Sequence, residues 1–138
     1  MDFKLELVLI PVADVDRAKQ FYVDTCGFTL DVDHQPNDAF RVVQVTPPGS
    51  ACSLTFGIGI TDAAPGSTRG THLVVTDIEA ARAWLVERGV EAGEPFHFGA
   101  EGQMPGVDPQ RQDYGSYLSV SDPDGNGWLV QEVKYQAP

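Results

Sequence analysis

Two stretches of the chain share one pattern of hydrophobic and polar positions. The first runs from Val12 to Phe28 and the second from Val75 to Val90. In each, apolar residues lead to an aspartate and then recur at the three- and four-residue spacing of a helix. Asp14 and Asp77 suit helix N-caps, because a carboxylate accepts hydrogen bonds from the free N–H groups of a first turn. The pattern predicts a strand followed by a helix in both stretches.

Both predicted helices end at a glycine and carry an aromatic residue at matching positions. The glycines are Gly27 and Gly89, and the aromatic residues are Phe21 and Trp84. Glycine suits the residue after a helix, because that residue usually has a positive φ. Large aromatic side chains are mostly buried, so we expect Phe21 and Trp84 to pack in the core.

The other apolar segments have strand length and are separated by turn residues. We expect strands at residues 5–12, 28–33, 40–45, 51–60, 71–75, 90–95, 117–120 and 127–133, with turns at 34–38, 46–50 and 121–126. The segments VTPPGSACSLTF (45–56) and SDPDGNGWLVQE (121–132) also match, so whole βαβββ units repeat. The sequence predicts a single α+β domain of two modules, about 1–60 and 70–138, joined by a linker at 61–69.

Composition narrows the classes of partner. The chain has 138 residues, 20 acidic against 9 basic, and a formal net charge of −11. This balance disfavours nucleic acid, which needs clustered Lys and Arg, and favours either plain solubility or a cationic ligand. No apolar run is long enough to cross a bilayer, so we expect no membrane partner. Two cysteines without metal or disulfide spacing, and no signal-peptide pattern at the N-terminus, predict a cytoplasmic protein.

Three motifs carry a family resemblance that covers essentially the whole chain. They are V-x-D-x-x-x-A-x-x-F-Y at Val12–Tyr22, V-x-D-I-x-x-A at Val75–Ala81, and D-P-D-G-N at Asp122–Asn126. With the repeated unit, they make the chain similar to the vicinal oxygen chelate superfamily, which includes glyoxalase I, extradiol dioxygenases and bleomycin-resistance proteins. The resemblance implies two modules whose curled mixed sheet surrounds a central cavity, and it implies a homodimer. Turn chemistry accounts for every residue of the last motif, so we expect it to be structural.

The resemblance also implies positions for a divalent metal in the metal-dependent members. In this chain those positions are Leu7, Ser53, Gly70 and Leu129, none of which is a good metal ligand. We therefore expect no cofactor. The alternative is a rebuilt divalent-metal site that uses His72 with His97, Gln131 or Glu132, although by alternation along its strand Glu132 should face away from the cavity.

The cavity lining expected from strand register is partly apolar with a few polar groups, which is typical of a small-molecule site. The expected ligand-binding residues are Leu7, Leu9, Ser53, Thr55, His72, Leu129, Gln131 and Tyr117. His72 is the candidate catalytic base, with a structural histidine as the alternative. Residues 96–115 form a long insertion, which holds Arg111 and Tyr114 and either covers the cavity or lies at a surface contact.

The sequence thus leaves four functions open, one of which is an interaction module that binds no small molecule. Of the other three, the first is metal-independent sequestration of an organic small molecule, as in bleomycin resistance. The second is a lyase or isomerase that uses His72. The third is a metal-dependent, glyoxalase-like lyase or a dioxygenase.

Overall fold

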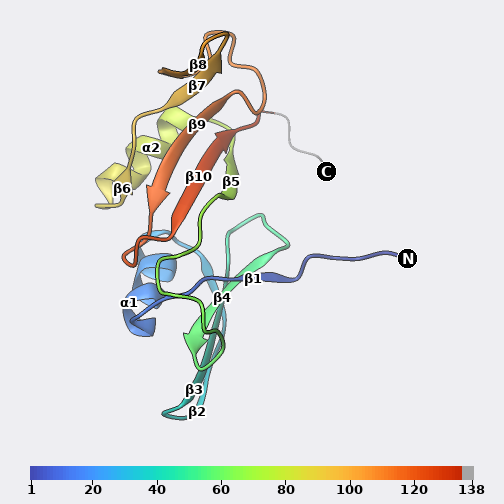
Figure 1. The fold of residues 1–138 in the computed structure, drawn as a ribbon, viewed down its shortest axis with the longest axis vertical. Helices are drawn as coiled ribbons and strands as arrows, with labels where there is room; N and C mark the ends of the chain where they lie inside the picture. Colours follow the sequence, from blue (N-terminus) through green and yellow to red (C-terminus); the bar gives the residue numbers. More distant parts are fainter. Residues whose placement is uncertain (135–138) are drawn as a thin grey trace. The chain divides into compact units, whose positions relative to one another are not determined.

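A computed structural model describes residues 1–134 (Figure 1). Contacts group these residues into two compact units. Unit 1 comprises Met1–Thr68 together with Asp122–Asn126, and unit 2 comprises Arg69–Ser121 together with the chain from Gly127 onward. The linker expected at residues 61–69 thus lies in unit 1 up to Thr68, and the end of the second module lies outside the described residues.

Unit 1 has the predicted βαβββ order. Its sheet runs β1 (Leu7–Leu9), β4 (Ser53–Ile58), β3 (Phe40–Thr46), β2 (Thr29–Asn37), with β1 parallel to β4 and the other pairs antiparallel. Helix α1 (Val15–Lys19) continues as a π-helical segment (Gln20–Thr25). Asp14 caps α1 by accepting from Arg17 N at 3.1 Å, as predicted. The buried core of the unit consists of Ile10, Val15, Ala18, Tyr22, Val43, Val45, Leu54 and Phe56.

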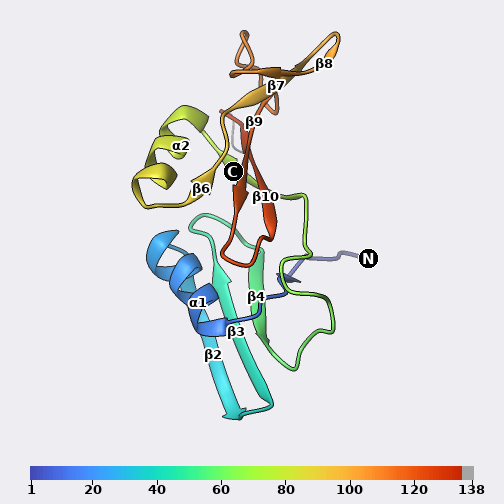
Figure 2. The same ribbon diagram turned by 60° about the vertical axis from the view of Figure 1, so that its left-hand side comes forward.

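Unit 2 repeats this plan with an extra hairpin. Its sheet runs β5 (Thr71–Val75), β10 (Gly127–Glu132), β9 (Ser116–Ser121), β7 (Phe96–Gly99), β8 (Gly102–Pro105), and β6 (Glu91–Ala92) also pairs with β9. Figure 2 shows helix α2 (Ile78–Glu87) against one face of this sheet. Asp77 caps α2 by accepting from Glu79 N and Ala80 N, each at 3.1 Å. Both modules are therefore α+β units with their helix on one face of the sheet.

Two local predictions were wrong. Residues 34–38 were expected to form a turn, but β2 continues to Asn37. A register shift between His34 and Asn37 accommodates Pro36, and proline is tolerated there because β2 is an edge strand. The insertion at 96–115 was expected to be a loop, but it contains the β7–β8 hairpin. The alternating F-H-F sequence at 96–98 explains this strand.

The helices are short, and α2 leaves its aromatic residue partly in solvent. Trp84 is 39% exposed, so the expectation that it packs in the core was wrong. The Arg88 guanidinium carbon lies 3.8 Å from the centroid of the Trp84 ring, and this stacking shields part of the indole. Within residues 1–134 no helix has the length and apolar character needed to span a membrane.

Candidate functional site

In unit 1, four of the expected ligand-binding residues share one face of the sheet. Leu7 pairs with Ser53 and Leu9 pairs with Thr55 in the parallel β1–β4 register, and laterally paired residues project to the same side. Ser53 and Thr55 are buried, whereas Leu9 is 40% exposed. The opposite face holds Phe56, whose ring centroid lies 5.7 Å from that of Tyr22 in the helical segment. The helix therefore covers the other side of the sheet.

In unit 2, the other four share one face of the second sheet. Leu129 is paired with His72 on β5, and Gln131 is paired with Tyr117 on β9. Two-residue spacing along β10 puts both pairs on the same side. The side toward α2 holds Trp128 and the other buried residues of β10. The alternation predicted from the sequence thus places these residues together within each unit.

Two aromatic residues that sequence reasoning missed extend this face of unit 2. Phe96 is paired with Tyr117, and their rings are stacked with centroids 5.5 Å apart and planes 17° apart. Phe98 meets both rings edge-on, at 5.9 Å from Phe96 and 5.5 Å from Tyr117. Phe98 is nevertheless 60% exposed. We call Phe96, Phe98 and Tyr117 the aromatic cluster.

His72 lies on the same face of the sheet as the aromatic cluster. Its Nδ1 is 2.6 Å from the carbonyl oxygen of Gly70. A carbonyl only accepts, so the neutral ring carries its proton on Nδ1 and leaves Nε2 as an acceptor. The side chain is exposed to solvent. His72 therefore presents one nitrogen to an incoming molecule.

The residues proposed for a rebuilt metal site are divided between the two faces. His97 is paired with Ser116, which is fully buried, and Glu132 is also fully buried next to the helix. His72 and Gln131 project to the other side. Among residues 1–134, no three His, Cys, Asp or Glu side chains gather in a group that could hold a metal ion. His72 and Gln131 are therefore separated from His97 and Glu132 by the sheet of unit 2.

A cavity of about 290 Å³ in unit 1 lies elsewhere. It is lined by Val12, Ala13, Val15, Gly57, Ile58, Gly59, Thr61, Asp62, Ala63 and Pro65. None of the expected ligand-binding residues lines it.

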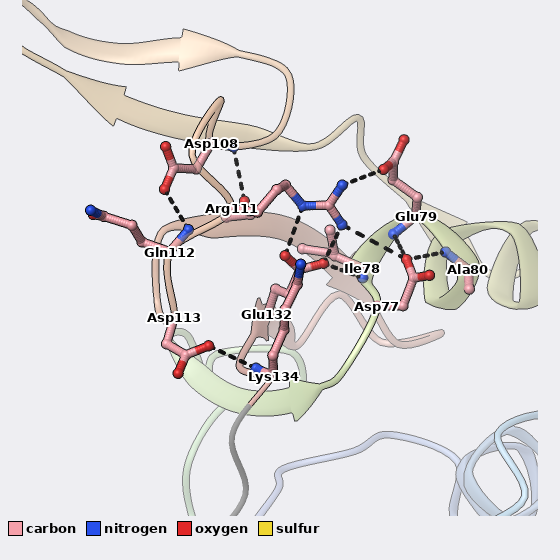
Figure 3. Close-up of polar contacts among 11 residues, drawn as sticks. Asp77, Ile78, Glu79, Ala80, Asp108, Arg111, Gln112, Asp113, Glu132 and Lys134 are labelled. Atoms are coloured by element: carbon pink, nitrogen blue, oxygen red, sulfur yellow. Dashed lines mark hydrogen bonds and ion pairs between the residues drawn. The ribbon is translucent and has the colours of Figure 1, made fainter.

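Arg111 connects the insertion to the start of α2 through hydrogen-bonded ion pairs (Figure 3). Its Nε and Nη2 donate to the two carboxylate oxygens of Glu132 at 2.9 and 2.5 Å. Its Nη1 donates to Glu79 at 2.7 Å. Glu132 also accepts from the backbone N–H of Ile78 at 3.0 Å. The Arg111 guanidinium therefore points to the helix N-terminus and not into the expected cavity lining.

The opposite charges of Arg111 and Glu132 shift the pKa of both residues. The bidentate bonds from Arg111 hold the pKa of Glu132 below its usual value, and the Ile78 N–H contributes in the same direction. Glu132 raises the pKa of Arg111 in turn. Arg111 and Tyr114 have φ values of +49° and +66°, a region that non-glycine residues rarely adopt. The contact with Glu132 thus holds the insertion in a backbone conformation that it would otherwise rarely adopt.

Comparison with known proteins supports the fold and the family. Residues 4–130 match the model of the family described as Glyoxalase/Bleomycin resistance protein/Dioxygenase superfamily. The crystal structure of TnmS3, an antibiotic-binding protein from Streptomyces sp. CB03234, is similar with 36% identity and a TM-score of 0.74, over 96% of this chain and 97% of that one. No curated protein matches the chain.

Two further crystal structures are similar over nearly their whole length. A glyoxalase/bleomycin resistance protein from the same Streptomyces strain has 36% identity and a TM-score of 0.70, over 94% of this chain and 100% of that one. A superfamily member from Sphaerobacter thermophilus DSM 20745 has 30% identity and a TM-score of 0.74, over 95% and 98%. With the family match and the repeated βαβββ units, these similarities show that the chain belongs to the glyoxalase/bleomycin resistance protein/dioxygenase superfamily.

Proposed function

We propose that this protein binds an organic small molecule of the antibiotic class and holds it without a metal ion. The observation that carries the proposal is the aromatic cluster, which presents the 60% exposed ring of Phe98 on the face that also carries Leu129, Gln131 and His72. The similarity to an antibiotic-binding protein, at 36% identity over almost the whole chain, supports the same class of ligand.

The cluster suits a flat, partly apolar ligand. A pair of aromatic rings contributes about 0.5–1.5 kcal/mol in addition to the free energy gained by burying its surface. Most of the Phe98 surface is exposed, so a ligand ring can cover it. Gln131 and the Nε2 atom of His72 supply hydrogen bonds on the same face. An apolar surface with a few polar groups is the usual composition of a small-molecule site.

A lyase or isomerase is the second candidate, because the Gly70 carbonyl fixes the His72 ring in the tautomer whose Nε2 accepts a proton. A metal-dependent lyase or dioxygenase has less support, since its ligand positions hold Leu7, Ser53, Gly70 and Leu129.

Cys26 and Cys52 are both free, which supports the expected cytoplasmic location.

Phe98→Ala is expected to weaken binding of an aromatic probe about tenfold, because the ligand loses one ring contact. The probe is proflavine, a flat fluorescent cation, titrated in low-salt and high-salt buffer. The net charge of −11 predicts weaker binding at high salt and preference for proflavine over the anion 8-anilinonaphthalene-1-sulfonate.

The matched control for this titration is Phe40→Ala, which removes a 36% exposed phenylalanine at the start of β3 in unit 1. Equal effects of the two substitutions would contradict the proposed site. Binding that survives treatment with EDTA and returns the probe chemically unchanged supports metal-independent sequestration. Conversion of the probe would support the His72 alternative.

We also infer a homodimer in which the N-terminal residues are covered by a second copy. Phe3 and Leu5 are 90% and 71% exposed and alternate with charged residues in phase with Leu7 and Leu9 of β1. Exposed apolar residues that lead into an edge strand favour association. Phe3→Ser combined with Leu5→Ser is expected to convert the dimer to a monomer in light scattering, whereas Lys4→Ser, on the alternate side, leaves it dimeric. A wild-type monomer would contradict the inference.

A further inference from the structure

His72 and the aromatic cluster lie on one continuous face of the sheet of unit 2. His72 lies opposite Leu129 across the β5–β10 pair. Tyr117 lies opposite Gln131 across the β10–β9 pair. With strands about 4.8 Å apart and residues about 3.3 Å apart along a strand, the backbones at His72 and Tyr117 are separated by about 12 Å. A single polycyclic ligand is long enough to meet both side chains.

This face carries almost no charge. The neighbours of His72 on it are Leu129 on β10 and Val74 two positions along β5, and Val74 is 47% exposed. Among the described strands of unit 2, the only Asp, Glu, Lys or Arg on this face is Glu91, which is paired with Ser121 at the end of β9 away from the aromatic cluster. An ammonium group beside His72 would therefore lose hydration without meeting a carboxylate there. A neutral polar group of the ligand suits this position better.

The hydrogen bond of His72 to the backbone determines what that neutral group must be. The Gly70 carbonyl, 2.6 Å from Nδ1, holds the ring proton on Nδ1. The neutral ring has no second N–H, so its Nε2 accepts a hydrogen bond and cannot donate one. The ligand must therefore supply the proton. An ether or carbonyl oxygen, which only accepts, would cover Nε2 and leave it unpaired.

We propose that His72 recognises a hydroxyl group on the ring system of the ligand, so that the ligand is a polycyclic phenol. One end of the ring system packs on Phe98 and Tyr117, and the hydroxyl at the other end donates to His72 Nε2. His72 determines specificity in this arrangement, and no covalent bond is made or broken. The inference rests on the proposed function and adds the chemical class of the ligand.

Two matched uncharged probes test this class of ligand. They are 1-hydroxypyrene, which donates a hydrogen bond, and 1-methoxypyrene, which only accepts. Both are fluorescent, so their binding is measured by titration of the emission. Wild-type protein is expected to bind 1-hydroxypyrene about fivefold more tightly, because one net hydrogen bond is gained. Phe98→Ala is expected to weaken both probes and to leave the ratio of their affinities unchanged, because both lose the same ring contact.

His72→Phe tests the acceptor. It removes Nε2 and keeps an aromatic ring, so the ratio of the two affinities is expected to fall to about one. The matched control is His97→Phe. The Nδ1 atom of His97 also lies 2.8 Å from a carbonyl oxygen, that of Gly106, but its side chain is on the opposite face of the sheet. This control should keep the wild-type preference. His72→Lys offers only donors, so its preference is expected to reverse towards 1-methoxypyrene.

The results separate this inference from the function on which it rests. Equal wild-type affinity for the two pyrenes, a preference for 1-hydroxypyrene that survives His72→Phe or His72→Lys, or an equal loss of preference in His97→Phe overturns the role of His72 and leaves aromatic binding standing. Failure of both pyrenes and of proflavine to bind, or pyrene binding that Phe98→Ala does not weaken, contradicts the proposed function as well.

Discussion

Asp122→Ala is expected to lower the free energy of unfolding by about 3–5 kcal/mol, because it removes four hydrogen bonds to a buried carboxylate at once. The Asp122 carboxylate accepts from the Tyr22 hydroxyl at 2.7 Å and from Asn126 Nδ2 at 2.8 Å. It also accepts from the backbone N–H groups of Asp124 and Asn126, at 3.0 and 2.8 Å. The residue is 5% exposed, so water cannot replace these bonds. Urea denaturation followed by circular dichroism measures the loss.

Two variants give reference values for the loss of unfolding free energy in Asp122→Ala. Tyr22→Phe removes one donor and keeps the ring, and it is expected to cost about 1 kcal/mol. Asp62→Ala removes an exposed loop carboxylate and should change stability by less than about 0.5 kcal/mol. If Asp122→Ala costs no more than Asp62→Ala, the carboxylate contributes only to local turn geometry.

The sequence of the turn predicts some of the hydrogen bonds around Asp122 and Asn126 but not others. Turn chemistry predicts the Asp-Pro-Asp-Gly-Asn segment, and it explains the bonds from Asp122 to the backbone of its own turn. It does not predict that the side chain of Asn126 donates to the Pro11 carbonyl at 2.9 Å and accepts from Thr68 N at 3.1 Å. Those partners lie 115 and 58 positions away, so only the folded chain identifies them.

The candidate site was predictable where the strands are regular. Two-residue alternation placed Ser53 with Thr55 and Leu129 with Gln131, and the register of both sheets agrees. Phe96 and Phe98 were missed because the sequences of the two copies diverge from residue 96 on, so the repeat gave no guide there.

The repeat did contain a signal for the Arg111 contact. The aligned hairpins match Glu132 with Phe56, a core residue of unit 1. A carboxylate at a core position needs a buried partner, because an unpaired charge there is costly. The sequence could therefore have predicted a cation against Glu132. It could not have named Arg111, which comes from an insertion that has no counterpart in the first module.

Glu132→Gln is expected to lower the free energy of unfolding at pH 7 by about 2–4 kcal/mol, because it replaces the charge-assisted bonds to Arg111 at nearly constant volume. The Glu132 side chain is 1% exposed. The matched control is Glu79→Gln, which removes the other carboxylate bonded to Arg111, at a side chain that is 62% exposed. Solvent screening is expected to make the loss in this control much smaller. Equal losses of unfolding free energy in Glu132→Gln and Glu79→Gln would show that the burial of Glu132 does not strengthen its ion pair with Arg111.

The difference between wild type and Glu132→Gln should also depend on pH in one direction. The folded pKa of Glu132 lies below its unfolded value, which is about 4.3. Its contribution to stability is therefore complete above the unfolded pKa and is lost as the pH falls through the folded pKa. Urea midpoints measured from neutral pH into strong acid should differ most at neutral pH and converge in acid. A difference that stays constant would mean that the substituted glutamine side chain disrupts packing and that the lost charge is not the cause.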